Sequence, residues 1–438
     1  MKATAVLLAL SLLASTAAAE PAEMYPGMAK AMAHIRAAFP QTIKEQREDK
    51  GDILGVPYPY TSPCAKEGFQ QLFNWDTYFI NLGLLRVGMQ SQAKNNVDDL
   101  LFLADKLGLV PNANRQSMAN RSQTPFLAVM VRDVYAATGD REWLQRAYPT
   151  LVREHSFWMT QRLAPIGLNR PGNSATTNYL LRFYAYLERE RFKGLAFTNQ
   201  SQKLAFSSQA LSEAEIWDFT PRFDRRAEEF CPADLNANLY LCEVTLAGFS
   251  KVLNNGEESA WREKAAGRKQ LIQEYLWNEE VGCYSDYDFV RKKKGNLVSG
   301  AALFPLMAGI ATPEQAAKVA RKMRAVLEYD HGLSTCEKGA WPFAYQWDYP
   351  NGWPPLQCVA VQALDRYGFK ADARRIAEKY VRTVIRNYET TGDLWEKYNA
   401  VTGTTQVVDE YKMPRMVGWT AGVFAYAADY LGCLKTEK

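Results

Sequence analysis

The chain has 438 residues and carries 52 basic and 48 acidic side chains, for a net charge of +4. This near balance gives no electrostatic basis for binding nucleic acid or a membrane surface. The histidines His34, His155 and His331 stand apart, and the seven cysteines follow no metal-ligand spacing. A zinc enzyme and a Ser-His-Asp hydrolase are therefore disfavoured, and no metal or cofactor is expected.

The N-terminus has the pattern of a secretory signal peptide. Met1-Lys2 is a short basic region, residues 3–14 are apolar, and Ala17-Ala18-Ala19 forms a small-residue cleavage site. We expect cleavage after Ala19 and a secreted or periplasmic mature chain, residues 20–438. No later stretch is apolar for long enough to span a bilayer. Because the cysteines number seven, at least one thiol is expected to stay free or to pair between chains.

Helical periodicity dominates the mature chain. Apolar stripes predict helices near 90–107, 123–138, 141–162, 175–190, 234–254, 257–276, 312–327, 354–367, 373–385 and 416–431. Thr312-Pro313-Glu314-Gln315 has the sequence of an N-cap, an N1 proline and a capping box, and the best strand candidate is 281–290. No linker or change in composition divides residues 20–438, so we expect one all-α domain. An (α/α) toroid fits the paired helices, and a two-lobed helical bundle is the alternative.

Four aromatic segments carry carboxylates that could cleave a glycosidic bond, which requires a proton-donating acid and a second carboxylate on the opposite face. They are residues 73–79, 216–223, 346–357 and 394–399, the last followed by 409–411. Residues 346–357 hold three aromatic rings and three prolines. We expect that segment to be a loop, too rigid and too polar for the core, that presents rings and polar groups to a polyhydroxylated ligand.

Two of these carboxylates suit the two roles. Asp218 lies between Trp217 and Phe219, and desolvation by the rings would help it to hold a proton. Glu396 precedes Lys397, whose charge would favour a carboxylate base if the side chains met. Each tryptophan–aspartate pair alone could equally be a helix-capping aspartate beside a packed ring. The residues by themselves therefore predict a helical carbohydrate-active enzyme without fixing its substrate.

Several motifs resemble those of the trehalases (glycoside hydrolase family 37), in the same order along the chain. They are residues 110–115, 120–126, 217–219, 234–236, 301–311, 346–357, 396–398 and 418–423. The resemblance implies an (α/α)6 toroid that acts with inversion, with Asp218 as the general acid and Glu396 as the general base. It also implies a substrate-binding set of Trp75, Asp76, Asn112, Arg121, Ser122, Gln123, Gln346, Trp347, Asp348 and Glu410.

Some of these binding residues have simpler interpretations, and some family positions differ. Arg121 could be a structural ion-pair partner, and Asn112 could only hold a turn. Gly68 stands where the family has a substrate-contacting arginine, and Ile216 stands where it has glycine. Residues 403–409 replace a glycine-rich loop by a stiffer one. The family's Arg-Pro-Glu-Ser motif is missing, and we expect Arg182 to substitute for its arginine.

The changes fall on sugar recognition, whereas both catalytic carboxylates are present. We therefore expect an inverting glycosidase that hydrolyses the disaccharide trehalose to two glucose molecules. A related α-glucosidase acting on another disaccharide or glucoside is the alternative, and so is an inactive sugar-binding toroid. The sequence indicates no oligomeric state.

Overall fold

The computed structural model describes residues 25–415 and 417–434, so the predicted signal peptide lies outside the described residues. Within these residues no helix is long and apolar enough to cross a membrane. The α-helices are α1 Met28–Ala38, α2 Asn74–Arg86, α3 Gln90–Leu107, α4 Leu127–Thr138, α5 Arg141–Gln161, α6 Thr177–Glu190, α7 Gln200–Glu213, α8 Ala233–Leu253, α9 Glu258–Leu271, α10 Phe304–Met307, α11 Pro313–Val326, α12 Pro354–Arg366, α13 Lys370–Thr391 and α14 Gly418–Tyr430.

Each helix predicted from an apolar stripe is present. Thr312 caps α11 in a complete capping box, with Gln315 bonding back to the cap. Helix α2 was not predicted, because it is buried along nearly its whole length from Asn74 to Leu84. A helix that is covered on all sides has no polar face, and so its sequence shows no amphipathic period.

All strands of the described residues are two residues long. They are β1 Ile43–Lys44, β2 Tyr60–Thr61, β3 Phe230–Cys231, β4 Trp277–Asn278, β5 Cys283–Tyr284, β6 Tyr287–Asp288, β7 Lys293–Lys294, β8 Glu328–Tyr329, β9 Gly332–Leu333, β10 Asn351–Gly352 and β11 Tyr398–Asn399. The predicted strand region 281–290 contains β5 and β6. Antiparallel pairing of β10 with β11 joins the 346–357 segment to the segment that carries Glu396.

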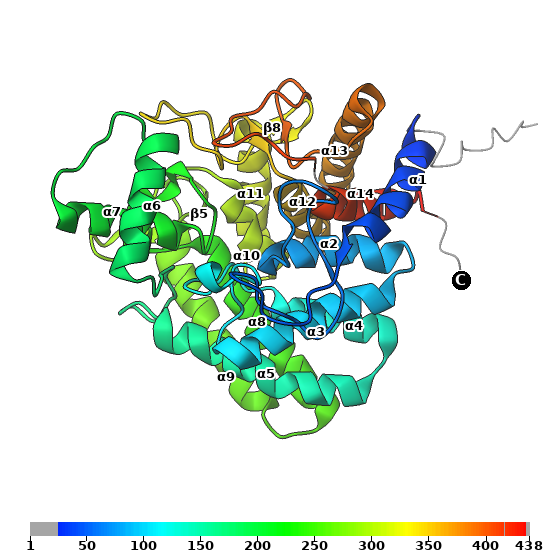
Figure 1. Cartoon of the computed structure of the whole chain (residues 1–438), viewed down its shortest axis with the longest axis horizontal. Coiled ribbons are helices and arrows are strands. Elements are labelled where there is room, and N and C mark those ends of the chain that lie inside the picture. Colours follow the sequence, from blue (N-terminus) through cyan, green and yellow to red (C-terminus); the bar gives the residue numbers. More distant parts are fainter. Residues whose placement is uncertain (1–24, 416, 435–438) are drawn as a thin grey trace, which may run out of the picture.

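Consecutive helices pack in pairs, and the chain closes on itself where α14 packs against α2 (Figure 1). This contact is unusually close because it uses two glycines. A Cβ atom on Gly422 would lie 2.0 Å from the carbonyl oxygen of Phe79, and one on Gly83 would lie 2.6 Å from the Cα of Gly422. Only glycine permits such an approach. The contact brings the start of α2, with Trp75 and Asp76, next to Trp419 of α14.

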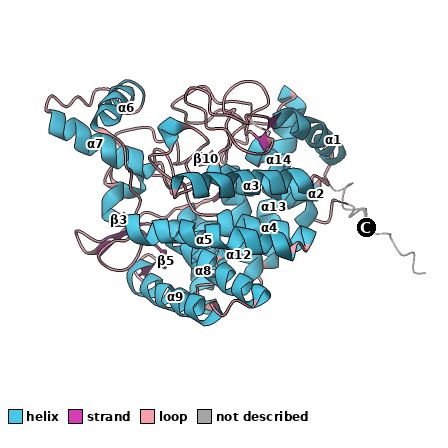
Figure 2. Ribbon diagram, turned by 60° about the horizontal axis from the view of Figure 1, so that its bottom comes forward, coloured by secondary structure: helices cyan, strands magenta, loops and turns pink. Residues whose placement is uncertain are grey.

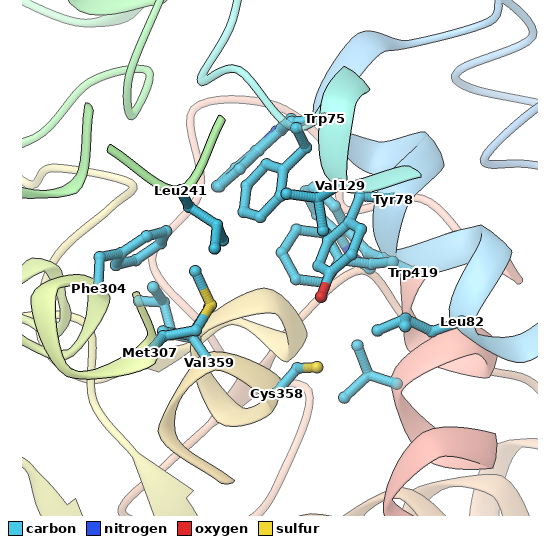
Figure 3. Close-up of a cluster of buried hydrophobic side chains, with 14 of the residues drawn as sticks. Trp75, Tyr78, Leu82, Val129, Leu241, Phe304, Met307, Cys358, Val359 and Trp419 are labelled. Atoms are coloured by element: carbon cyan, nitrogen blue, oxygen red, sulfur yellow. The ribbon is translucent and has the colours of Figure 1, made fainter. Parts of the chain in front are cut away.

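The main core lies between these helices. Figure 3 shows Trp75, Tyr78 and Leu82 of α2 packed with side chains from α4, α8, α10, α12 and α14. Trp75 and Trp419 are 2% and 5% exposed. They belong both to this core and to the wall of the cavity described next, so the core fixes one side of the candidate site.

Candidate active site

A cavity of about 400 Å³ gathers most of the residues expected to form the site, and its volume is in the range of small-molecule sites. Ten of the predicted residues line it: Trp75, Asp76, Asn112, Arg121, Gln123, Asp218, Gln346, Trp347, Glu396 and Glu410. Its wall also contains residues that were not predicted: Phe69, Phe73, Met118, Tyr179, Phe183, Tyr186, Arg191, Ala214, Ile216, Trp353, Tyr411 and Trp419.

Two predicted binding residues are buried outside the cavity lining. Ser122 donates its hydroxyl to the carbonyl of Val110 at 2.7 Å, and its backbone N–H donates to Glu215 at 2.8 Å. Both contacts are internal to the protein, so Ser122 holds the chain rather than facing the cavity. Asp348 is 5% exposed, and burial raises its pKa to about 6.

Arg182 is exposed on α6 and does not line the cavity, so the expectation that it replaces the missing family arginine does not fit the structure. Arg191, directly after α6, lies in the cavity wall instead. The sequence Glu188-Arg189-Glu190-Arg191 looks like a solvated helix end, which is why Arg191 was missed. The aromatic residues Phe192 and Phe197 that follow were the one available signal that the chain turns inward there.

Glu396 is held from three sides. One carboxylate oxygen lies 2.7 Å from the Nζ atom of Lys397, and the other accepts a hydrogen bond of 2.7 Å from the hydroxyl of Tyr411. The indole of Trp419 donates to its backbone carbonyl at 2.8 Å. The pairing with Lys397 that the sequence suggested is therefore present. Lys397 is fully buried and also pairs with Asp409, so its positive charge stabilises both carboxylates in a dry environment.

Asp218 has a different environment from the one expected. Its side chain is 44% exposed, and Oδ2 lies 2.7 Å from Nη2 of Arg191. Trp217 stacks on Trp347 at 5.5 Å, and Phe219 packs on Tyr345 at 4.8 Å. The half-exposed side chain does not agree with the prediction that the neighbouring rings desolvate Asp218, because both rings pack on other aromatic side chains.

Arg191 links Asp218 to Glu410. Its Nη2 atom donates to one oxygen of Glu410 at 2.9 Å, and its Nε lies 2.6 Å from the other. Tyr186 donates its hydroxyl to Glu410 at 2.9 Å. Burial raises the pKa of Glu410, the Arg191 charge opposes this, and the nearby Asp218 charge adds to it. Two carboxylates therefore share one guanidinium, and Arg191 holds the two side chains together.

Asp76 is a second carboxyl group that favours its protonated form. It lies in the first turn of α2 and is 6% exposed. Burial raises its pKa to about 8, and the charge of Glu396 adds to the shift. Asp76 is thus mostly neutral at pH 7 and can donate a hydrogen bond as well as accept one.

The tryptophans of the site form a packed cluster beneath the carboxylates. Trp347 and Trp353 stack with ring centroids 4.0 Å apart and planes within 2°, and Trp419 meets Trp353 edge-on at 5.6 Å. Trp347 is 4% and Trp353 1% exposed. The prediction that this segment is too rigid and too polar for the core was wrong, because the buried Asn351 side chain pairs its amide by donating to the carbonyls of Gln346 and Val408.

Several polar groups of the cavity have unused hydrogen-bonding capacity. Nη1 of Arg121 donates to Asn120 at 2.9 Å, whereas its buried Nε has no partner among the described residues. Gln346 donates to Tyr411 at 2.7 Å, and its buried Oε1 is unpaired within the same part of the chain. A ligand rich in hydroxyl groups could satisfy both. The described residues contain no cluster of three or more His, Cys, Asp or Glu that could hold a metal ion.

The altered family positions have structural consequences. Gly68 has a φ of +83°, and a Cβ atom there would lie 3.2 Å from the sulfur of Cys64. This backbone disfavours any larger residue, including arginine. Ile216 fills part of the cavity wall. The 403–409 loop is anchored, since Val408 exchanges hydrogen bonds of 3.0 and 2.7 Å with the Asn351 side chain.

Comparisons with known proteins find relatives over most of the chain. A family profile described as trehalase matches residues 20–432. The periplasmic trehalase of Xanthomonas campestris pv. campestris (strain B100) is 33% identical, over 89% of this chain and 71% of the relative. That of Xanthomonas oryzae pv. oryzae (strain MAFF 311018) is 32% identical with the same coverage.

Solved structures match the fold. Neutral trehalase Nth1 from Saccharomyces cerevisiae has a TM-score of 0.74 at 24% identity, over 91% of this chain and 79% of that one. The GH63 mannosylglycerate hydrolase from Thermus thermophilus has a TM-score of 0.59 at 18% identity, over 91% and 99%. These likenesses confirm the predicted all-α (α/α)6 toroid.

Proposed function

The chain belongs to the trehalase family of glycosidases, and on that premise we propose that it hydrolyses α,α-trehalose to two glucose molecules with inversion. The observation that carries the proposal is that Asp218 and Glu396 line one cavity in opposite settings. Glu396 is buried against a lysine, whereas Asp218 is half exposed and pairs with Arg191. An inverting glycosidase needs one carboxylate of each kind.

Glu396 acts as the base. Lys397 and Tyr411 each hold one of its oxygens, which fixes the carboxylate but leaves lone pairs to accept a proton from water. Water activated in this way attacks the anomeric carbon from the face opposite the leaving sugar. Because Lys397 also pairs with Asp409, the residues around Glu396 are already in position before substrate binds.

Asp218 acts as the acid and protonates the bridging oxygen as the bond to the leaving glucose breaks. Its ion pair with Arg191 stabilises the carboxylate that this step produces. Burial raises the pKa of Glu410, which binds the same guanidinium. Arg191 thus holds the Asp218 carboxyl group in the cavity wall, where it can transfer a proton to the bridging oxygen.

The glucosyl unit that is attacked lies between the two carboxylates. Protonated Asp76, the free Oε1 of Gln346 and the unpaired Nε of Arg121 supply hydrogen bonds to its hydroxyl groups. Trp75 and Trp347 form part of the apolar wall beside this unit. We further propose that residues 20–438 are one catalytic domain, exported to the periplasm after cleavage at Ala19. The N-terminal sequence and the periplasmic relatives support this location.

The test is glucose release by the purified mature protein from trehalose and from a panel of maltose, isomaltose and methyl α-glucoside. Asp218→Asn protein serves as the control for contaminating activity. Release from trehalose that the variant lacks is expected. Release from another glucoside alone would favour the related α-glucosidase, which the glycine at position 68 makes the second candidate. Trehalose binding without turnover would overturn the proposal in favour of a binding protein.

A further inference from the structure

Helices α6 and α7 form a hairpin that stands apart from the main core. They pack chiefly on each other and lie together at the edge of the molecule (Figure 2). A separate small apolar cluster joins them to the toroid, and it comprises Leu187, Phe192, Ala210, Phe219 and Tyr345. This hairpin follows the position where the family's Arg-Pro-Glu-Ser motif is missing. Its side chains form one part of the cavity wall.

Helix α6 turns an aromatic face toward the cavity. Tyr179, Phe183 and Tyr186 are four and three residues apart, so they fall on one side of the helix. All three line the cavity and are only partly buried. The rings of Phe183 and Tyr186 lie 5.9 Å apart with planes within 16°, and those of Tyr179 and Phe183 are 6.3 Å apart. The planes of Tyr179 and Phe183 are tilted by 32° to each other, so the three rings form an aromatic stripe along α6, which we call the aromatic wall.

This wall lies on the acid side of the cavity. Tyr186 bonds to Glu410, and Arg191 at the end of α6 bonds to both Glu410 and Asp218. The acid protonates the oxygen of the leaving group, so the leaving sugar must lie next to Asp218. Glu396 and its water act on the other face. The aromatic wall is therefore adjacent to the leaving group and not to the glucosyl unit under attack.

We propose that Tyr179, Phe183 and Tyr186 form the stacking surface for the leaving sugar and determine which leaving groups this enzyme accepts. The inference depends on the proposed function. Aromatic rings bind the C–H face of a pyranose or an aryl group without hydrogen bonds to individual hydroxyl groups. The substrate class is accordingly α-glucosides whose leaving group has a flat apolar face, of which trehalose is one.

The test compares two substrates with different leaving groups. Trehalose places a sugar against the wall, whereas α-glucosyl fluoride releases a small ion that needs neither stacking nor protonation. We expect Phe183→Ala to lower kcat/KM for trehalose about tenfold, the loss that corresponds to about 1.4 kcal/mol of ring contact. The value for α-glucosyl fluoride should change less than twofold. Phe183→Leu keeps most of the packing volume and should show the same selective loss if the alanine variant folds poorly.

Phe197→Ala is the matched control. Phe197 belongs to the same hairpin and packs on Phe206 at 5.3 Å, but it does not line the cavity. It should leave the ratio of the two kcat/KM values unchanged. Equal losses on both substrates in Phe183→Ala and Phe183→Leu, or the same selective loss in Phe197→Ala, would overturn this proposal alone. A wild-type protein that hydrolyses neither substrate would overturn the proposed function and this inference with it.

Discussion

The two ends of the catalytic cavity are built in different ways. The Glu396 end is part of the toroid core, where α2 and α14 meet over a tryptophan cluster and a buried lysine neutralises the carboxylates. The Asp218 end is half exposed and depends on a helical hairpin with a small core of its own. The base end therefore fixes the position of the Glu396 carboxylate, whereas the acid end transfers the proton and determines which leaving groups are accepted.

The largest expected effect separates the two carboxylates by substrate. Asp218→Asn and Glu396→Gln should each lower kcat on trehalose by roughly 10²–10⁴-fold, the usual contribution of a positioned acid or base. On α-glucosyl fluoride, Glu396→Gln should remain as impaired, whereas Asp218→Asn should regain most of the activity because fluoride leaves without protonation. Steady-state kinetics on both substrates, with circular dichroism to confirm folding, measures this. An Asp218→Asn protein that is equally impaired on both substrates would contradict the assignment of the acid.

The next effect concerns stability. Lys397→Met removes a fully buried cation and leaves Glu396 and Asp409 without their partner. Breaking such a pair costs about 3–5 kcal/mol in the free energy of unfolding. Urea denaturation at pH 7 should show this loss, and Arg374→Met, which removes a half-exposed arginine paired with Glu378, should cost about 1 kcal/mol or less. Similar losses in the two variants would mean that the base end is not specially dependent on its lysine.

A third effect is the pH dependence contributed by Asp76. Its pKa is about 8 in the folded protein and about 3.9 in an unfolded chain. The folded state therefore binds more protons between these values, and the free energy of unfolding falls as pH rises through that window. Asp76→Asn should remove the contribution of Asp76 to this decrease in the free energy of unfolding. That contribution is on the order of a few kcal/mol by pH 8, since one pKa unit corresponds to about 1.4 kcal/mol.

Asp99→Asn is the control for this prediction. Burial also raises the pKa of Asp99 to about 8, but this residue lies outside the cavity. In both variants the free energy of unfolding, measured by urea denaturation, should decrease less as pH rises. Only Asp76→Asn should lower activity. Unchanged activity in Asp76→Asn would show that this group does not contact the sugar.

The smallest expected effect lies outside both ends. Thr312→Ala removes the N-cap of α11. The Thr312 side chain accepts a hydrogen bond from the backbone N–H of Gln315. Loss of such a cap costs about 1 kcal/mol, and thermal unfolding should show it without any change in kcat/KM. A change in kcat/KM would show that the cavity is coupled to α11, and the division into two local ends would then be too simple.

The base end was largely predictable from sequence, and the acid end was not. Glu396 and Lys397 are neighbours in the chain, and the capped or amphipathic helices have local signals. Arg191 contacts Asp218, which is 27 positions away in the sequence, and Glu410, which is 219 positions away. A local sequence pattern does not indicate contacts between residues so far apart. The buried 346–357 segment was misjudged for a related reason, since the side chain of Asn351 is paired by the backbone of the distant Val408.

The central claim is best tested by proton NMR of trehalose during the first minutes of hydrolysis, before the glucose anomers equilibrate. Attack of water from the face opposite the leaving group converts one glucose to the β anomer, while the leaving glucose keeps its α configuration. Equal initial amounts of α- and β-glucose are therefore expected. Initial release of α-glucose alone would contradict an inverting pair of Asp218 and Glu396, and the absence of any glucose would contradict the proposed activity itself.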